Sequence, residues 1–119
     1  MQLQQLPADC EDLNAFWERT GCAWRSVVEA ASASGGVSVC VIGHAAVHSA
    51  LLCHCLGLTK EDLRKFRMST AGISVIDFPG GAAAPAVVRS HNYTAHLGRW
   101  AVPISRDDEV MVCGIDGCF

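Results

Sequence analysis

The hydrophobic pattern changes its period near the middle of the chain. Residues 37–42 are β-branched and apolar on both alternating faces, which predicts a strand covered on both sides. From residue 45 the apolar positions recur at helical spacing as far as Cys55, and Gly57 is well suited to end that helix. We therefore expect His44 at the carboxyl end of a buried strand, beside the free amides of a helix N-terminus. Such amides favour an anion.

The segment before this junction predicts a long amphipathic helix. Apolar residues form one stripe from residue 11 to about residue 31, and this stripe includes Trp17 and Trp24, which we expect in the core. Asp9 is a plausible N-cap for this helix, because its carboxylate can accept a hydrogen bond from a first-turn amide.

The segment after the junction predicts a short helix and a hairpin. Thr59 and Asp62 have the spacing of a capping box, which would open a helix that reaches about Phe66. Residues 72–78 and 86–92 then read as strands on either side of a loop rich in proline and glycine. We expect these two strands to pair as an antiparallel hairpin, so the chain as a whole is of the α/β class.

Composition limits the classes of partner. The chain has 119 residues and a formal net charge of −3, and its few basic residues are scattered, which argues against a nucleic-acid partner. It has seven cysteines, an odd number, and four of them fall inside predicted helix or strand, where a thiol packs as a small hydrophobe. This usage indicates a reducing, intracellular compartment.

No segment predicts a membrane partner. The first residues lack both the basic and the apolar regions of a signal peptide. Residues 37–58 are long enough to span a bilayer, but they carry three histidines and an internal glycine, which a strand followed by a helix explains better. We therefore expect an intracellular, cytoplasmic location, with the chloroplast stroma as the alternative if a transit segment lies upstream.

Four segments carry a family resemblance. Residues 39–52, 56–58, 69–78 and 92–97 resemble, in order and spacing, the C-terminal half of the histidine phosphatase superfamily, which includes the phosphoglycerate mutases. The residues of these segments are most similar to those of a plant and cyanobacterial branch of that family. The resemblance implies the C-terminal half of a three-layer α/β/α sandwich over residues 7–97. Residues 98–119 would then form a tail, which we expect to be loosely ordered.

The resemblance also implies a chemistry. In this family a first histidine, within an Arg-His-Gly motif, attacks the phosphoryl group and becomes phosphohistidine. His44 matches the second histidine, which donates a hydrogen bond to the same group, and the backbone N–H of Ala45 would bind the phosphate as well. The implied substrate is a small phosphorylated metabolite, and no metal or other cofactor is needed.

The sequence departs from the family at Ala45, where the family usually has glycine, at Thr70, where many members have asparagine, and above all in two catalytic groups. No Arg-His-Gly occurs in these residues, and the carboxylate that serves as the proton donor of the family has no counterpart here. We therefore expect the chain to be inactive alone. Two hypotheses remain open. The chain is part of a phosphatase or phosphomutase, or it is a catalytically inactive module that binds phosphate or a partner.

The histidines have two alternatives to the family role. His44 could be a satisfied structural residue. A zinc site built from His48, Cys40 and the Cys53–Cys55 turn is disfavoured, because the side chains of that turn point in different directions around the helix.

In the family, the strand that carries Arg-His-Gly lies beside residues 37–42. Without it we expect an uncovered sheet edge and self-association through that edge.

Overall fold

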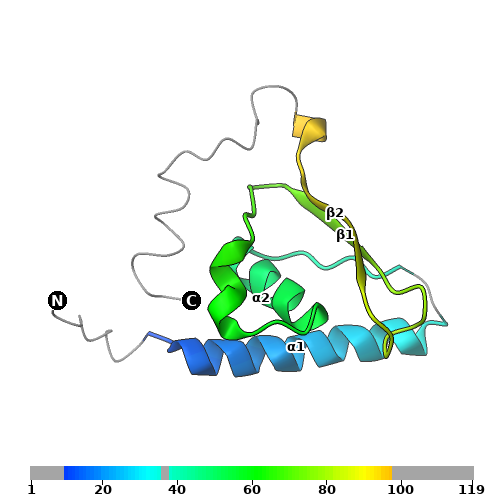
Figure 1. The fold of residues 1–119 in the computed structure, drawn as a ribbon, viewed down its shortest axis with the longest axis horizontal. Coiled ribbons are helices and arrows are strands. Elements are labelled where there is room, and N and C mark those ends of the chain that lie inside the picture. Colours follow the sequence, from blue (N-terminus) through cyan, green and yellow to red (C-terminus); the bar gives the residue numbers. More distant parts are fainter. Residues whose placement is uncertain (1–9, 36–37, 98–119) are drawn as a thin grey trace, which may run out of the picture.

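The computed structural model describes residues 10–35 and 38–97, and it has the mixed helix and sheet composition that the sequence predicts (Figure 1). A long helix forms the base of the molecule, a shorter helix packs on it, and a hairpin rises beside both. The elements in chain order are α1 (Leu13–Ala33), α2 (Ala45–Cys55), η1 (Lys60–Lys65), β1 (Ile73–Asp77), β2 (Val87–Tyr93) and η2 (Ala95–Leu97).

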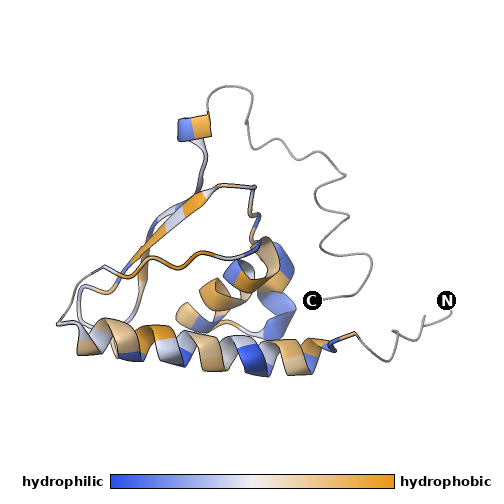
Figure 2. Ribbon diagram, turned by 180° about the vertical axis from the view of Figure 1, so that it is seen from behind, coloured by the Kyte–Doolittle hydropathy of each residue, from blue (hydrophilic) through white to orange (hydrophobic). Residues whose placement is uncertain are grey.

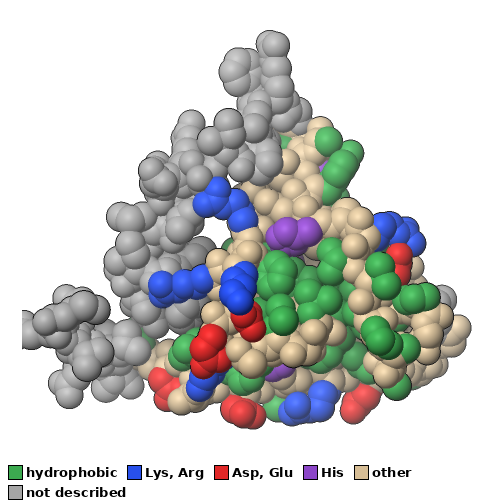
Figure 3. Space-filling model, in the orientation of Figure 1, with side chains coloured by type: hydrophobic (Ala, Val, Ile, Leu, Met, Phe, Trp, Pro, Cys, Tyr) green, Lys and Arg blue, Asp and Glu red, His purple; other side chains and the backbone are tan. Residues whose placement is uncertain are grey.

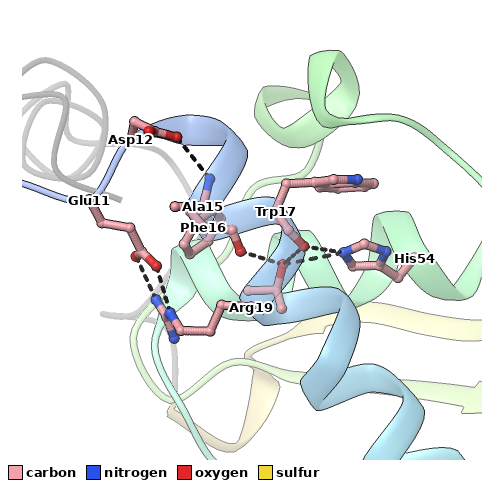
Figure 4. Close-up of polar contacts among 8 residues, drawn as sticks. Glu11, Asp12, Ala15, Phe16, Trp17, Arg19 and His54 are labelled. Atoms are coloured by element: carbon pink, nitrogen blue, oxygen red, sulfur yellow. Dashed lines mark hydrogen bonds and ion pairs between the residues drawn. The ribbon is translucent and has the colours of Figure 1, made fainter.

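Helix α1 starts three residues later than its predicted cap implies. Asp12 is the N-cap, and its Oδ1 accepts a hydrogen bond of 2.8 Å from the N–H of Ala15. The prediction of Asp9 was therefore wrong, and Asp9 itself lies outside the described residues. Arg19 donates two hydrogen bonds of 2.8 Å to the carboxylate of Glu11, which joins the residue before the helix to its second turn (Figure 4). This contact lowers the pKa of Glu11.

The buried core lies where α1, α2 and η1 meet. Its fully or nearly buried members are Phe16, Ala50, Cys53 and Leu63. Trp17, Ala46, Val47, Leu58 and Phe66 are partly buried and pack against this cluster. Trp24 packs against Phe78 of the hairpin segment, with ring centroids 5.8 Å apart. Both predicted core tryptophans are thus partly buried at contacts between elements.

Helix α2 and the segments after it follow the predictions. Helix α2 ends at Cys55, and Gly57 follows with φ of +68°, a left-handed conformation that glycine adopts without strain. The capping box of Thr59 and Asp62 is present at η1. Strands β1 and β2 pair antiparallel, with Ile76 opposite Val88 and irregular register nearer the start of β1. The predicted hairpin is therefore confirmed.

The predicted strand at residues 37–42 is wrong for the part that the structure describes. Residues 38–43 form neither helix nor strand, and the exposed fractions are 43% for Val39, 41% for Val41 and 92% for Ile42. Figure 2 shows this segment as an almost continuously hydrophobic coil that crosses between α1 and the hairpin. A strand needs a neighbouring backbone to bond to. Within the described ranges, β1 and β2 pair only with each other, so residues 38–43 have no such neighbour.

Two predicted thiol environments are also corrected. Cys22 and Cys40 are exposed, whereas Cys53 is buried and Cys55 is half-buried. Burial raises the pKa of both Cys53 and Cys55, which keeps these two thiols neutral.

Among the helices of the described ranges, none combines the length and the apolar character that crossing a membrane requires.

Candidate phosphate-binding site

His44 lies at the N-terminus of α2, as predicted. It is the N-cap residue, with φ of −108° and ψ of 162°, and its carbonyl accepts a hydrogen bond of 3.0 Å from the N–H of His48. The His44 imidazole is exposed and makes no capping hydrogen bond. The N–H groups of Ala45, Ala46 and Val47 precede the first helical hydrogen bond, so they have no acceptor within α2. No acidic side chain lies in this first turn.

These features suit an anion. Three amides and the positive end of the helix dipole lie beside an imidazole that can donate a hydrogen bond or carry a charge. Because residues 38–43 do not form a strand, His44 does not follow a strand as predicted. It is still the N-cap residue of α2, since the helix itself determines which residue precedes its first turn. His44 and Ala45 are therefore adjacent at one helix end, and His44 and residues 38–43 before it are exposed.

His48 belongs to α2, one turn after His44, and its side chain lies against Gly43. Its Nε2 lies 3.2 Å from where a Cβ would stand on Gly43, so a larger residue at position 43 would displace the imidazole. The same Nε2 is buried without a hydrogen-bond partner. Burial, followed by the nearby His44, lowers the pKa of His48. His48 therefore stays neutral to lower pH than an ordinary histidine.

His54 joins α2 to α1 at the other end of the helix. Its Nε2 is 3.1 Å from the carbonyl oxygen of Trp17 and 3.2 Å from Thr20 Oγ1 (Figure 4). Because a carbonyl oxygen can only accept, Nε2 must carry the hydrogen. The imidazole stacks on the Trp17 ring with centroids 3.8 Å apart, and a Cβ on Gly21 would lie 3.1 Å from its Cε1. Sequence reasoning missed this contact, since it grouped His54 with the neighbouring cysteines.

We expect the folded chain to lose stability as the pH falls from 7.5 to 5.5. Burial is the main cause that lowers the pKa of both His48 and His54. In the unfolded chain these groups return to about 6.5, so the unfolded state takes up protons first. Their stabilising effect is therefore complete above that value and is lost as the pH falls below it. Urea unfolding at the two pH values measures the change as a lower midpoint at pH 5.5.

The variant His54→Gln serves as the control for this pH dependence. Its amide can still donate to the Trp17 carbonyl, but it does not titrate, so the midpoint should fall less with pH. The carboxylates of Glu11, Glu61 and Asp62 do not interfere, because their pKa values are lowered from an already acidic range. Equal midpoints for the original chain at pH 7.5 and pH 5.5 would contradict the prediction.

The described residues offer no grouping for the zinc alternative. Within 10–35 and 38–97, no three side chains of histidine, cysteine, aspartate or glutamate are gathered as metal ligands would be. Cys53 lies in the core, His54 contacts α1, and Cys40 is exposed on the irregular segment. The histidines that the sequence placed near one another thus take up three different environments.

Comparison with known proteins gives consistent matches. The family model for the histidine phosphatase superfamily (branch 1) matches residues 2–92. A protein of Arabidopsis thaliana named probable 2-carboxy-D-arabinitol-1-phosphatase is 44% identical over 101 residues, which cover 82% of this chain and 21% of that protein. The 2-carboxy-D-arabinitol-1-phosphatase of Triticum aestivum is 42% identical over 103 residues, covering 83% of this chain and 21% of its own length.

The chain therefore spans a small part of these relatives, 21% of the length of each. Both proteins come from plants, in agreement with the plant and cyanobacterial branch that the sequences of the four matching segments indicated. No solved structure gives a significant match.

Proposed function

Because this chain belongs to the histidine phosphatase superfamily, we propose that it supplies one side of a phosphoryl-transfer site. In this proposal, His44 and the first-turn amides of α2 hold the phosphoryl group of a small phosphomonoester. The observation that carries it is the position of His44, an exposed N-cap histidine beside amides that have no acceptor in the helix.

The proposed chemistry follows from what a phosphoryl group needs. Its charge is spread over three equatorial oxygens, and catalysis depends on donors fixed around them. His44 supplies a side-chain donor and Ala45 a backbone donor. The family resemblance assigns the attack to a histidine of an Arg-His-Gly motif. Since none of these 119 residues forms that motif, the nucleophile has to come from another polypeptide segment.

The proposed reaction is hydrolysis through phosphohistidine. The P–O bond to the substrate alcohol breaks as the nucleophilic histidine takes the phosphoryl group, and water then releases inorganic phosphate from the histidine. The matched relatives carry the name of a phosphatase for a carboxylated sugar-alcohol phosphate, so we extend the proposal to phosphomonoesters of small polyhydroxy acids. We also propose that the reaction takes place inside the cell and without a metal.

A second candidate is a module that binds phosphate or a partner without catalysing a reaction. The absence of Arg-His-Gly from these residues favours it. Both candidates require the same half-site at α2, so an anion-binding experiment tests what they share. They differ in whether a segment that carries the nucleophile restores turnover.

We expect inorganic phosphate to bind weakly at the N-terminus of α2. In an NMR titration of the full chain, millimolar phosphate should shift the amide signals of residues 43–47 most. Because helix-terminal amides and an imidazole are the proposed donors, His44→Ala should weaken this binding about tenfold or more, since a hydrogen bond to a charged group is worth about 1.5–3 kcal/mol and about 1.4 kcal/mol is a factor of ten.

The matched control is His96→Gln, which changes another exposed histidine. His96 lies in η2, and its Nε2 is 2.8 Å from the carbonyl oxygen of Ala71. Glutamine can keep that hydrogen bond, so the phosphate titration should be unchanged. The proposal is wrong if phosphate shifts are absent, or if His44→Ala and the control bind phosphate as well as the original chain.

A further inference from the structure

Arg67 differs from the other cationic side chains in the described part of the chain. It is exposed and makes no hydrogen bond or ion pair with any described residue. The others each have an interaction partner: Arg19, Arg25, Lys60, Arg64, Lys65 and Arg89. In Figure 3 Lys and Arg side chains border the apolar centre of the face shown, over the region of η1. An unpaired guanidinium beside η1 is therefore available to an anion.

The backbone on both sides of Arg67 is held in place. Phe66 packs against the buried core, and its ring lies edge to face with His91 at a centroid distance of 5.6 Å. On the other side, the N–H of Ser69 donates to Asn92 Oδ1 at 2.8 Å, and Asn92 Nδ2 donates to Ser69 Oγ at 3.0 Å. Arg67 thus extends from a fixed stretch, so binding a ligand has to order its side chain but not the backbone.

The corner that holds Ser69 is strained. Ala71 has φ of +57°, a left-handed conformation that costs energy for alanine, whereas Asn92, with φ of +51°, is of a residue type that tolerates this region. A Cβ on Gly72 would lie 2.3 Å from Asn92 Oδ1, so this position needs glycine for close approach. Strain of this kind persists where surrounding contacts fix the conformation, and it is concentrated at binding and catalytic sites.

This corner is connected to the proposed phosphate site through the core. Phe66, Ala46 and Val47 pack against the same buried cluster, and Ala46 and Val47 belong to the first turn of α2. Figure 1 shows the end of segment 38–43, η1 and the start of β1 at the same end of the molecule. Arg67 and His44 therefore lie on elements fixed to one another by shared packing.

We propose that Arg67 binds a carboxylate of the substrate whose phosphoryl group is held by His44. This inference rests on the proposed function and assigns a specificity-determining residue to it. The planar guanidinium can donate two parallel hydrogen bonds to the two oxygens of a carboxylate. Because Arg67 is exposed and the contact is open to water, we expect roughly a two- to fivefold gain in affinity.

The test compares two ligands that differ at one group. 6-Phosphogluconate carries a carboxylate where sorbitol 6-phosphate carries a hydroxymethyl group. NMR titrations of the full chain with both ligands, and with inorganic phosphate, give three dissociation constants. We expect the original chain to prefer 6-phosphogluconate, and Arg67→Gln to remove that preference while leaving the affinities for sorbitol 6-phosphate and phosphate unchanged. Arg67→Lys should retain part of the preference for 6-phosphogluconate, because lysine keeps the positive charge but cannot donate two parallel hydrogen bonds.

Arg25→Gln is the control for net charge. Arg25 is an exposed arginine of α1 that contacts Cys22, so its loss removes the same charge away from the corner and should leave the preference intact. If inorganic phosphate and sorbitol 6-phosphate fail to bind the original chain, the proposed function fails. If they bind but the preference is absent, survives in Arg67→Gln, or is lost equally in Arg25→Gln, the role of Arg67 is overturned.

Discussion

The chain is expected to self-associate in solution through residues 38–43, and the substitution Ile42→Lys is expected to make it monomeric. Val39, Val41 and Ile42 are exposed on a segment that has no partner strand in the described ranges. No aspartate, glutamate, lysine or arginine occurs between Glu29 and Lys60, so no charge opposes pairing with a second chain. Ile42 is 92% exposed, so lysine there adds a charge without disturbing the core.

Sedimentation velocity at increasing protein concentration checks this expectation. The original chain should form dimers or larger species, whereas Ile42→Lys should remain at the monomer mass of 12.7 kDa. Ser32→Lys adds the same charge at an exposed position near the end of α1 and should leave the association unchanged. A monomeric original chain at high concentration would show that another part of the protein covers this segment.

Replacing Phe16 with alanine is expected to remove a large part of the stability of the chain. Phe16 is 1% exposed, and it lies in the cluster where α1, α2 and η1 meet. Truncation of a buried phenylalanine costs about 3–5 kcal/mol, which approaches the whole stability of a small domain, about 5–15 kcal/mol. Alanine is the strongest helix former, so the loss would come from packing and not from the helical preference of α1.

Leu13→Ala is the matched control on the same helix. Leu13 is 37% exposed at the first position of α1, so its truncation should cost under about 1 kcal/mol. Circular dichroism during urea unfolding measures both variants. A midpoint for Phe16→Ala close to that of Leu13→Ala would mean that the three elements are not held together by this cluster.

The sequence by itself determined the elements whose hydrogen bonds are local. Helix α2 begins after His44 and ends before Gly57, as its spacing predicted, because a helix satisfies its backbone groups within a few residues. The capping box at Thr59 and the hairpin of β1 and β2 were found for the same reason, since their partners are near in the chain. The placement of His44 at a helix N-terminus followed from this local order. The N-cap of α1 was missed because two aspartates, Asp9 and Asp12, precede the helix and either can cap it.

Only the tertiary structure decided what depends on distant partners. Residues 38–43 have the composition of a buried strand, yet a strand forms only against another backbone, and the described residues supply none. The contact of His54 with Trp17 and the hydrogen bonds between Ser69 and Asn92 also join residues far apart in sequence. Packing of the elements likewise leaves Arg67 without a partner among the described residues. Residue spacing describes one element at a time, whereas these features arise from how elements pack against each other.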